Sequence, residues 1–198
     1  MKIKAGTGEL LGMGNIVILG WGSLIWDPTE KWGKTVKKTW HDDGPYLPLE
    51  FSRVSGKRNG ALTLVIDPRN GKQCRTKYVY SRRVNLDTAV MDLARREKCS
   101  VDNIGYVDLD FGFSFARRQD VVNRIRSWAE RRHFGAVIWT DLPPSIRGNF
   151  NVEAGLRYIQ SLDTEARIEA LQYVFAAPDS INTPFRQRVI EECGLKQK

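Results

Sequence analysis

The sequence predicts one mixed α and β domain, with strands clustered early in the chain and helices late. The length of 198 residues allows one domain with a sizeable core and is short for two. Hydrophobic residues make up 41% of the chain and aromatic residues 10%, a composition typical of folded globular proteins. Short apolar runs bounded by glycine or proline lie mostly in the first half of the chain and stretches of helical character mostly in the second, and no repeat is present. These observations together favour a mixed α+β fold.

Most of the strands are predicted in the first half of the chain. Residues 1–14 contain four glycines and few apolar residues, which indicates a loose N-terminal arm. Residues 15–19 form a continuous apolar, β-branched run closed by Gly20, which is typical of a buried strand. Glycine-containing turns at residues 56–60 and 67–71 separate the strands that follow. Those strands are predicted at residues 49–54, 61–66 and 75–81.

The second half of the chain is predicted to be mainly helical. It also contains one buried strand, at residues 135–140, which ends before Pro143-Pro144. In the first half of the chain, residues 30–48 are aromatic, basic and rich in turns, and we expect them to form an ordered excursion without regular strands or helices. Helices are predicted at residues 87–98, 120–132, 152–162 and 164–175, with a last short helix beginning near residue 183.

The chain is strongly basic, with a net charge of +8 and an isoelectric point near 9.5. Its arginines form doublets at residues 82–83, 95–96, 117–118 and 131–132. A cationic surface attracts nucleic acid, acidic proteins or anionic metabolites. No zinc finger, basic leucine zipper or RNP aromatic motif accompanies the charge, so a solvated cationic surface is the simpler interpretation. Binding to nucleic acid or to an acidic protein stays open as the alternative.

The sequence favours a cytoplasmic location without membrane association. No segment approaches the roughly 18 consecutive apolar residues that a membrane span needs. The first residues are polar and lack the apolar region of a secretory signal. The three cysteines, Cys74, Cys99 and Cys193, form no C-x-x-C pair, which suits free thiols in a reducing compartment. His41 and His133 lack metal-ligand spacing, so no metal site is predicted.

The loop after the first predicted strand is the strongest candidate for a binding site. Two glycines that flank one residue allow unusual backbone torsions and let a ligand approach the main chain closely. N–H groups in such a loop receive anions, and a serine hydroxyl adds both a donor and an acceptor. The sequence therefore predicts capture of a carboxylate or of a polarised carbonyl. The loop residues are Gly20, Trp21, Gly22, Ser23 and Leu24.

The segment Ile18-Leu19-Gly20-Trp21-Gly22-Ser23-Leu24-Ile25-Trp26 resembles the glutamyl-binding loop of γ-glutamylcyclotransferases, especially of the ChaC-type branch. That branch carries Phe-Gly-Tyr-Gly-Ser-Leu, followed by an apolar residue and tryptophan, directly after its first strand. Trp21 stands where the family usually has tyrosine, and an indole N–H donates a hydrogen bond but cannot accept one. The resemblance covers about residues 15–110 and implies a small β-barrel or sheet with surrounding helices. Residues 120–198 form a divergent helical part without correspondence to the family.

The family also has a catalytic glutamate near the end of a helix, in a pattern that resembles Leu-Asp-x-Arg-Glu. Glu97 is the residue that matches this pattern. It shares one predicted helical face with Val90, Leu93 and Ala94, so its carboxylate points toward the core. Apolar surroundings raise the pKa of a carboxyl group, which suits a general acid or base near neutrality. The alternative is that Glu97, in the last turn, pairs with a neighbouring arginine.

The resemblance implies an enzyme that converts an L-γ-glutamyl compound into 5-oxoproline and a free amine. The α-amine of the substrate attacks its own γ-carbonyl, so no cofactor, metal or enzyme nucleophile is required. By analogy, the backbone at Gly22, Ser23 and Leu24 holds the glutamyl group and stabilises the oxyanion. Glu97 takes the proton from the α-amine and passes it to the leaving nitrogen.

Three further residues are candidates for the same site. Arg53, on a predicted strand, is expected to pair with a substrate carboxylate, although a surface arginine needs no such role. Tyr78 and Tyr106 are expected to line the pocket, although each also fits an ordinary core position.

The sequence leaves three interpretations of function. The first is a cyclotransferase, or a close acyl-transferring relative, acting on a small γ-glutamyl molecule. The second is a binding or regulatory protein that kept the fold and lost or changed the chemistry. The third is a cationic protein that docks on nucleic acid or an acidic partner. Glu97 is essential in the first, dispensable or only ligand-tuning in the second, and unimportant in the third.

Overall fold

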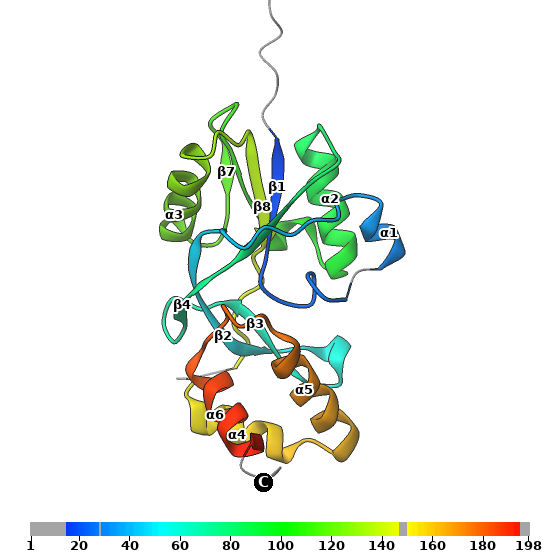
Figure 1. Ribbon diagram of the computed structural model, residues 1–198, viewed down its shortest axis with the longest axis vertical. Coiled ribbons are helices and arrows are strands. Elements are labelled where there is room, and N and C mark those ends of the chain that lie inside the picture. The colour runs from blue at the N-terminus through cyan, green and yellow to red at the C-terminus, as the bar shows by residue number, and fades with distance from the viewer. Residues whose placement is uncertain (1–14, 28, 147–149, 195–198) are drawn as a thin grey trace, which may run out of the picture.

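Two β-sheets and the helices around them make up the fold. The computed structural model describes residues 15–27, 29–146 and 150–194, and every structural statement below refers to these residues. The predicted N-terminal arm, residues 1–14, lies outside them. Figure 1 shows the larger sheet with a helix on each side and a helix-rich part below it. The predicted mixed α+β class is confirmed.

The larger sheet has five strands, and a parallel pair lies within it. The strands are β1 (Ile16–Gly20), β5 (Lys77–Tyr80), β6 (Ile104–Asp108), β7 (Ser114–Phe115) and β8 (Ala136–Thr140). Their order across the sheet is β5-β1-β8-β6-β7. β1 runs parallel to β8, whereas β1 with β5, β6 with β8 and β6 with β7 are antiparallel pairs. The carboxyl ends of β1 and β8 therefore meet at the same edge of the sheet.

Both faces of β1 are buried, which explains its continuous apolar sequence. Leu19 belongs to the core cluster that includes the apolar face of helix α3 (Gln119–Glu130). Its neighbour Ile18 belongs to the cluster that includes helix α2 (Leu86–Glu97). Because side chains alternate along a strand, the two helices cover opposite faces of the sheet, as Figure 1 shows.

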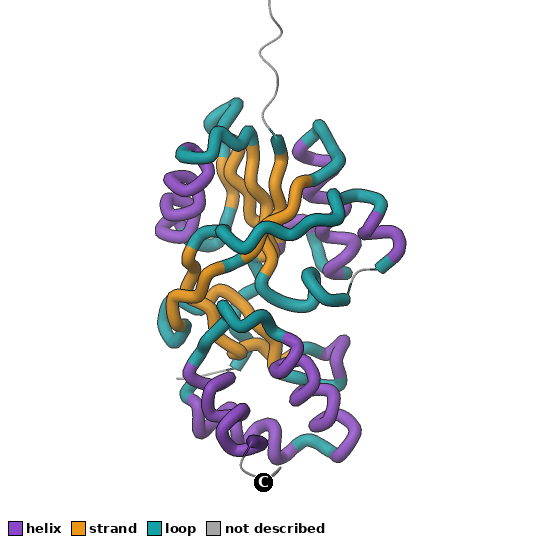
Figure 2. Tube along the Cα trace, viewed as in Figure 1, coloured by secondary structure: helices purple, strands orange, loops and turns teal. Residues whose placement is uncertain are grey.

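The smaller sheet supports the C-terminal helices. Its three antiparallel strands, in the order β3-β2-β4, are β2 (Tyr46–Val54), β3 (Leu62–Ile66) and β4 (Lys72–Arg75). The helices are α4 (Val152–Ser161), α5 (Thr164–Ala176) and α6 (Pro184–Gly194). Figure 2 shows that these helices gather at one end of the molecule, next to the smaller sheet. Phe51 of β2 packs against the rings of Tyr173 in α5 and Phe185 in α6.

The buried side chain of Arg186 holds α5 and α6 together. Its guanidinium donates hydrogen bonds to four backbone carbonyls, at distances from 2.6 to 3.2 Å. Carbonyls at the end of a helix lack partners within the helix, and a charged donor satisfies them strongly. The carbonyls belong to Val174, Ala177, Pro178 and Ile181.

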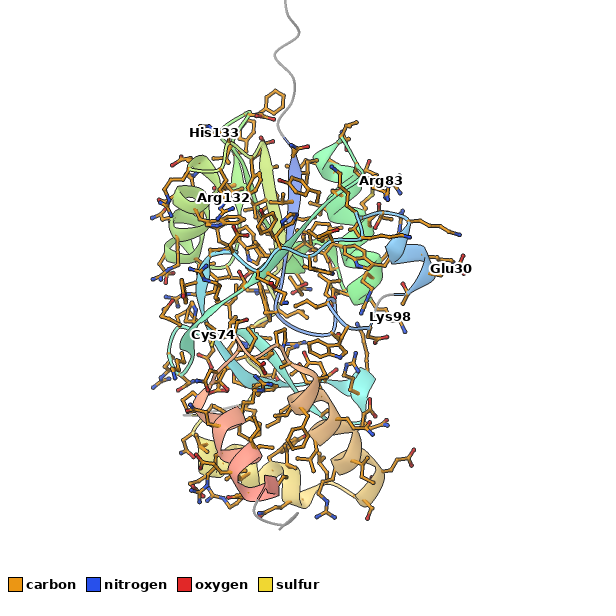
Figure 3. All side chains as sticks on the ribbon, viewed as in Figure 1. Glu30, Cys74, Arg83, Lys98, Arg132 and His133 are labelled. Atoms are coloured by element: carbon orange, nitrogen blue, oxygen red, sulfur yellow. The ribbon has the colours of Figure 1, made fainter. Side chains whose placement is uncertain are left out.

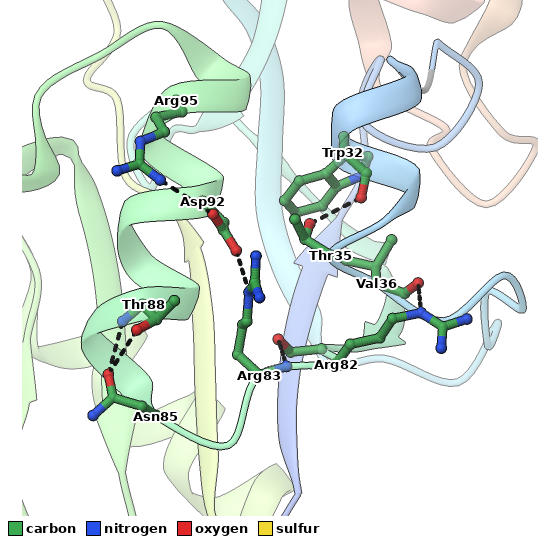
Figure 4. Close-up of polar contacts among 10 residues, drawn as sticks. Trp32, Thr35, Val36, Arg82, Arg83, Asn85, Thr88, Asp92 and Arg95 are labelled. Carbon is green, nitrogen blue, oxygen red and sulfur yellow. Dashed lines mark hydrogen bonds and ion pairs between the residues drawn. The ribbon is translucent and has the colours of Figure 1, made fainter.

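Helix α2 is anchored at its start and along one side (Figure 4). The side-chain oxygen of Asn85 caps it by accepting a backbone N–H of the first turn at 2.9 Å. Asp92, in the middle of the helix, pairs with Arg83 at 2.6 Å. The neighbouring Arg82 donates to the carbonyl of Val36 at 2.8 Å. The contacts of Asn85 and Asp92 hold the first part of the helix, which ends at Glu97.

The structure corrects two expectations about the strands. The strand predicted at 75–81 is interrupted at the buried residue Thr76, so β4 lies in the smaller sheet and β5 in the larger one. The hydroxyl of Thr76 donates to the carbonyl of Pro45 at 2.8 Å and stabilises this corner. The described strands form two open sheets and no closed barrel, so the β-barrel alternative is wrong for them.

Other elements lie in segments for which no regular structure was predicted. They are α1 (Glu30–Gly33), the 3-10 turns at Gly56–Arg58 and Val101–Asn103, β6 and β7. β6 contains Gly105, a residue that disfavours strands, and the reason is a close approach: a Cβ there would collide with the ring of Trp139. Among the described residues, no helix is both long enough and apolar enough to cross a membrane.

Glu50, a buried carboxyl group on β2, makes stability depend on pH. It accepts the N–H of Phe51 at 2.8 Å, and burial raises its pKa from an ordinary value of 4.5 to about 7. The folded state therefore binds this proton more tightly than the unfolded chain does. The resulting stabilisation is complete below about pH 4.5 and is lost as the pH rises to about 7.

We predict that Glu50→Gln flattens this part of the pH dependence. Between pH 4.5 and 8 the wild-type free energy of unfolding should fall, relative to the variant, by at most about 3 kcal/mol. Urea unfolding of both proteins at several pH values measures this difference. An unchanged difference between wild type and variant across the range would contradict the assignment.

Candidate functional site

A pocket of about 620 Å³ lies where the two sheets meet. The loop after β1, the residues after β8 and the end of α2 form one side of it. The end of β2, the start of β3 and Tyr173 of α5 form the other. Because β1 and β8 are parallel neighbours, the pocket lies outside the carboxyl ends of parallel strands, where open sheets commonly bind ligands.

The predicted loop, residues 20–24, lines this pocket. Neither of its glycines has a positive φ, so unusual torsions are not what they supply. They supply space: a Cβ on Gly20 would lie 2.6 Å from the ring of Trp40, and one on Gly22 would lie 2.7 Å from the hydroxyl of Tyr173. The carbonyls of Gly22 and Ser23 accept backbone N–H groups at 3.0 and 2.8 Å. The N–H groups of Gly22 and Leu24 have no acceptor among the described residues.

Trp21 anchors this loop to the smaller sheet. Its side chain is 5% exposed and belongs to the main core. Its indole N–H faces the carbonyl of Leu64 in β3 at 3.4 Å. The indole thus serves the packing of the loop, and its N–H already has an acceptor.

Tyr173 was not anticipated from the sequence. It comes from α5, is buried, and places its hydroxyl against Gly22. Burial raises its pKa to about 12, and hydrogen bonds from the backbone of Leu64 and Ser23 act in the opposite sense. The phenol therefore keeps its proton at neutral pH. No local pattern indicated this contact, because it joins segments far apart in the chain.

Glu97 is the last residue of α2, and its carboxylate lines the pocket. The predicted apolar face is confirmed, since Leu93 and Ala94 are buried and Val90 packs against the same cluster. Burial raises the pKa of Glu97, and the nearby charges of Arg96 and two other cations lower it by less. The carboxylate lies 3.8 Å from Arg96, but both groups stay within the pocket, so pairing does not turn Glu97 out to solvent.

Arg96 links helix α2 to the loop, and sequence reasoning gave it no role. Its side chain is only 10% exposed. It donates to the carbonyl of Asp27 at 2.7 Å and to that of Ser23 at 3.3 Å. Its Nε–H is buried and has no partner among the described residues. Because an unpaired buried donor is costly, an acceptor from a bound ligand would stabilise this group.

The pocket is cationic. Two of the cations are used to hold the structure: Lys57 donates to the carbonyls of Glu97, at 2.6 Å, and of Lys98, which end helix α2. Arg53 lines the pocket as expected and donates to the carbonyl of Pro143 at 2.8 Å. Burial and the charge of Arg117 lower the pKa of Arg53. The charged lining residues are Arg53, Lys57, Arg58, Arg96 and Lys98 against Asp27 and Glu97.

Tyr78 and Tyr106 lie outside this pocket. Tyr78 is buried on the α3 side of the larger sheet, where it stacks on His41 with ring centroids 4.7 Å apart. Tyr106 stacks on Phe115 and lines a separate cavity beside Phe111. Both side chains stand on faces of strands, whereas the pocket lies at strand ends.

Among the described residues, no group of three or more His, Cys, Asp or Glu side chains could hold a metal ion. Neither family models, nor curated proteins, nor solved structures contain a match to this chain. The chemistry of the pocket is therefore the basis for assigning a function.

The packing of Gly22 on Tyr173 leads to a prediction about the loop. Gly22→Ala should destabilise the protein by about 2 kcal/mol, because the new Cβ would meet the phenolic oxygen at 2.7 Å. Tyr173→Phe in the same chain should recover most of that loss, since the next nearest atom is 3.8 Å away. Thermal unfolding of the two single variants and the double variant measures this coupling.

Gly33→Ala is the matched control, because a Cβ at Gly33 would meet nothing within 4 Å. Additive effects of Gly22→Ala and Tyr173→Phe would show that the two groups are not in contact.

Proposed function

We propose that this protein is a γ-glutamylcyclotransferase-like enzyme that releases 5-oxoproline from a small γ-glutamyl amide or peptide. One observation carries the proposal. The loop and the glutamate that resemble this family, although far apart in the chain, line the same pocket. The raised pKa of Glu97 further supports a role in proton transfer near neutral pH.

The loop and Arg96 would bind the charged end of the substrate. The unused N–H groups of Gly22 and Leu24 and the unpaired Nε–H of Arg96 are donors for its α-carboxylate and for the oxyanion. The excess of cations around the pocket attracts the same carboxylate. Holding the glutamyl chain folded brings the α-amine to the γ-carbonyl, which supplies most of the rate by proximity.

The reaction then needs only the movement of one proton. The α-amine nitrogen forms a bond to the γ-carbon, and the bond from that carbon to the leaving nitrogen breaks. Glu97 accepts the proton released by the α-amine and delivers it to the leaving nitrogen, so the enzyme ends unchanged. The products are 5-oxoproline and a free amine. The phenol of Tyr173 stays protonated and packs against Gly22 of the loop.

Glu97→Gln should abolish this activity without unfolding the protein. We expect 5-oxoproline release from a panel of γ-glutamyl compounds by wild type, and a loss of at least about 100-fold in the variant. Glu130→Gln is the matched control, because Glu130 is likewise the last residue of a helix but is exposed and away from the pocket.

The outcomes separate the interpretations. Activity that survives Glu97→Gln would show that another group carries the proton. No product from any compound of the panel would overturn the proposal and favour a binding protein that uses the same pocket.

The pH profile gives a second test of Glu97. The carboxylate must be deprotonated to act as a base, so kcat/KM should fall on the acid side with a midpoint above 4.5, the ordinary pKa of glutamate. Lys57→Met removes a charge that lowers the pKa of Glu97, so the midpoint should move to higher pH. Lys38→Met, at an exposed position outside the pocket, is the control. A midpoint that Lys57→Met leaves in place would mean that a different group titrates.

A further inference from the structure

A second cationic cavity lies on the other side of the molecule from the candidate site. Its volume is about 580 Å³. It is lined by residues just before and at the start of β2, by β4, and by α3 with the turn that follows. It shares no described lining residue with the candidate site. In Figure 3 its residue Arg132 lies beside α3, across the molecule from Lys98 of the candidate site.

Four arginines and one carboxylate line this cavity. The carboxylate, Asp43, pairs with Arg132 at 2.7 Å. Within the described part of the chain, the other three arginines have no carboxylate partner. They are Arg75, Arg124 and Arg131.

Neutral groups hold two of these arginines in place. The guanidinium of Arg75 lies over the ring of Tyr46, 4.8 Å from its centroid. Arg124 donates to the side-chain oxygen of Gln73 at 3.0 Å. Neither contact neutralises the charge, so each guanidinium is oriented but keeps its full attraction for an anion.

Four other arginines of the protein contrast with this arrangement. Arg83 and Arg95 both pair with Asp92, Arg118 pairs with Asp120, and Arg188 pairs with Glu192. The cavity instead concentrates cations whose charges repel one another. A bound anion would remove that repulsion, which is a driving force for binding.

We propose that this cavity binds adjacent phosphate groups. Each phosphate group places charge on several oxygens in a small volume, and guanidinium groups bind such oxygens through paired hydrogen bonds. Each carboxylate side chain carries only one charge. Several acidic residues would therefore have to enter a cavity of about 580 Å³ to balance the charge of the three arginines that lack a carboxylate partner. The phosphates can come from a free nucleoside triphosphate or from a nucleic-acid strand.

The test is binding of two labelled probes, ATP and a single-stranded RNA, followed by fluorescence anisotropy at physiological salt. We expect one or both to bind, inorganic tripolyphosphate to compete, and the affinity to fall as salt rises. Arg124→Glu combined with Arg131→Glu should weaken binding at least about tenfold. Arg157→Glu combined with Arg188→Glu is the control, because it removes two exposed arginines elsewhere with the same change in net charge.

The two probes distinguish the sources of phosphate: tighter binding of ATP indicates a nucleotide site, and tighter binding of RNA indicates a strand. Binding of neither probe, or equal weakening by the control pair, would overturn the proposal. Binding of a polyglutamate peptide with no binding of phosphates would also overturn it, in favour of an acidic protein. Arg124→Gln with Arg131→Gln repeats the test if charge reversal prevents folding. Release of 5-oxoproline should be the same in all these variants, so this proposal and the proposed function fail independently.

Discussion

The burial of β1 on both faces is the constraint on which the rest of the structure depends. A strand between β5 and β8 that is apolar on both sides must be covered twice, and α2 and α3 provide the two covers. The parallel pairing of β1 with β8 then brings both carboxyl ends to one edge. The chain leaves β1 at that edge through the loop, and α2 ends beside it.

The site is a junction of four separate parts of the chain: the loop after β1, the end of α2, the connection between β2 and β3, and α5. Arg96 connects the end of α2 to the loop carbonyls, and Lys57, from the connection between β2 and β3, satisfies the last carbonyls of the same helix. Tyr173 of α5 packs against Gly22 of the loop. Arg186 of α6 binds carbonyls at the end of α5 and so holds the two helices together. Helix α5 is therefore part of the site, although the family resemblance does not extend to it.

The sequence predicts correctly those features that depend on residues close to one another in the chain. Leu19 and its apolar neighbours indicated a buried strand, and the spacing of Leu93 and Ala94 placed Glu97 on the inner face of its helix. Long-range contacts left no such pattern, so Tyr173 was missed. Tyr78 was misplaced because its register opposite Leu19 puts it on the α3 face of the sheet, away from the strand ends. The sequence predicts the loop glycines for unusual torsions and for close approach of a ligand, whereas in the structure they leave room for Trp40 and Tyr173.

The net charge of +8 is the sum of cations that have different roles in the structure. In the candidate site, several cations already have structural acceptors: Arg58 pairs with Asp27, Arg96 binds loop carbonyls and Lys57 ends a helix. Such cations line the pocket, and Arg96, Lys57 and Arg58 lower the pKa of Glu97. Around the second cavity Arg132 pairs with Asp43, but the contacts of Arg75 and Arg124 are with neutral groups, so their charge is left for a ligand. The composition of the chain gives only the sum of these charges. The contacts of each cation in the fold distinguish one that stabilises the structure from one that is left to bind an anion.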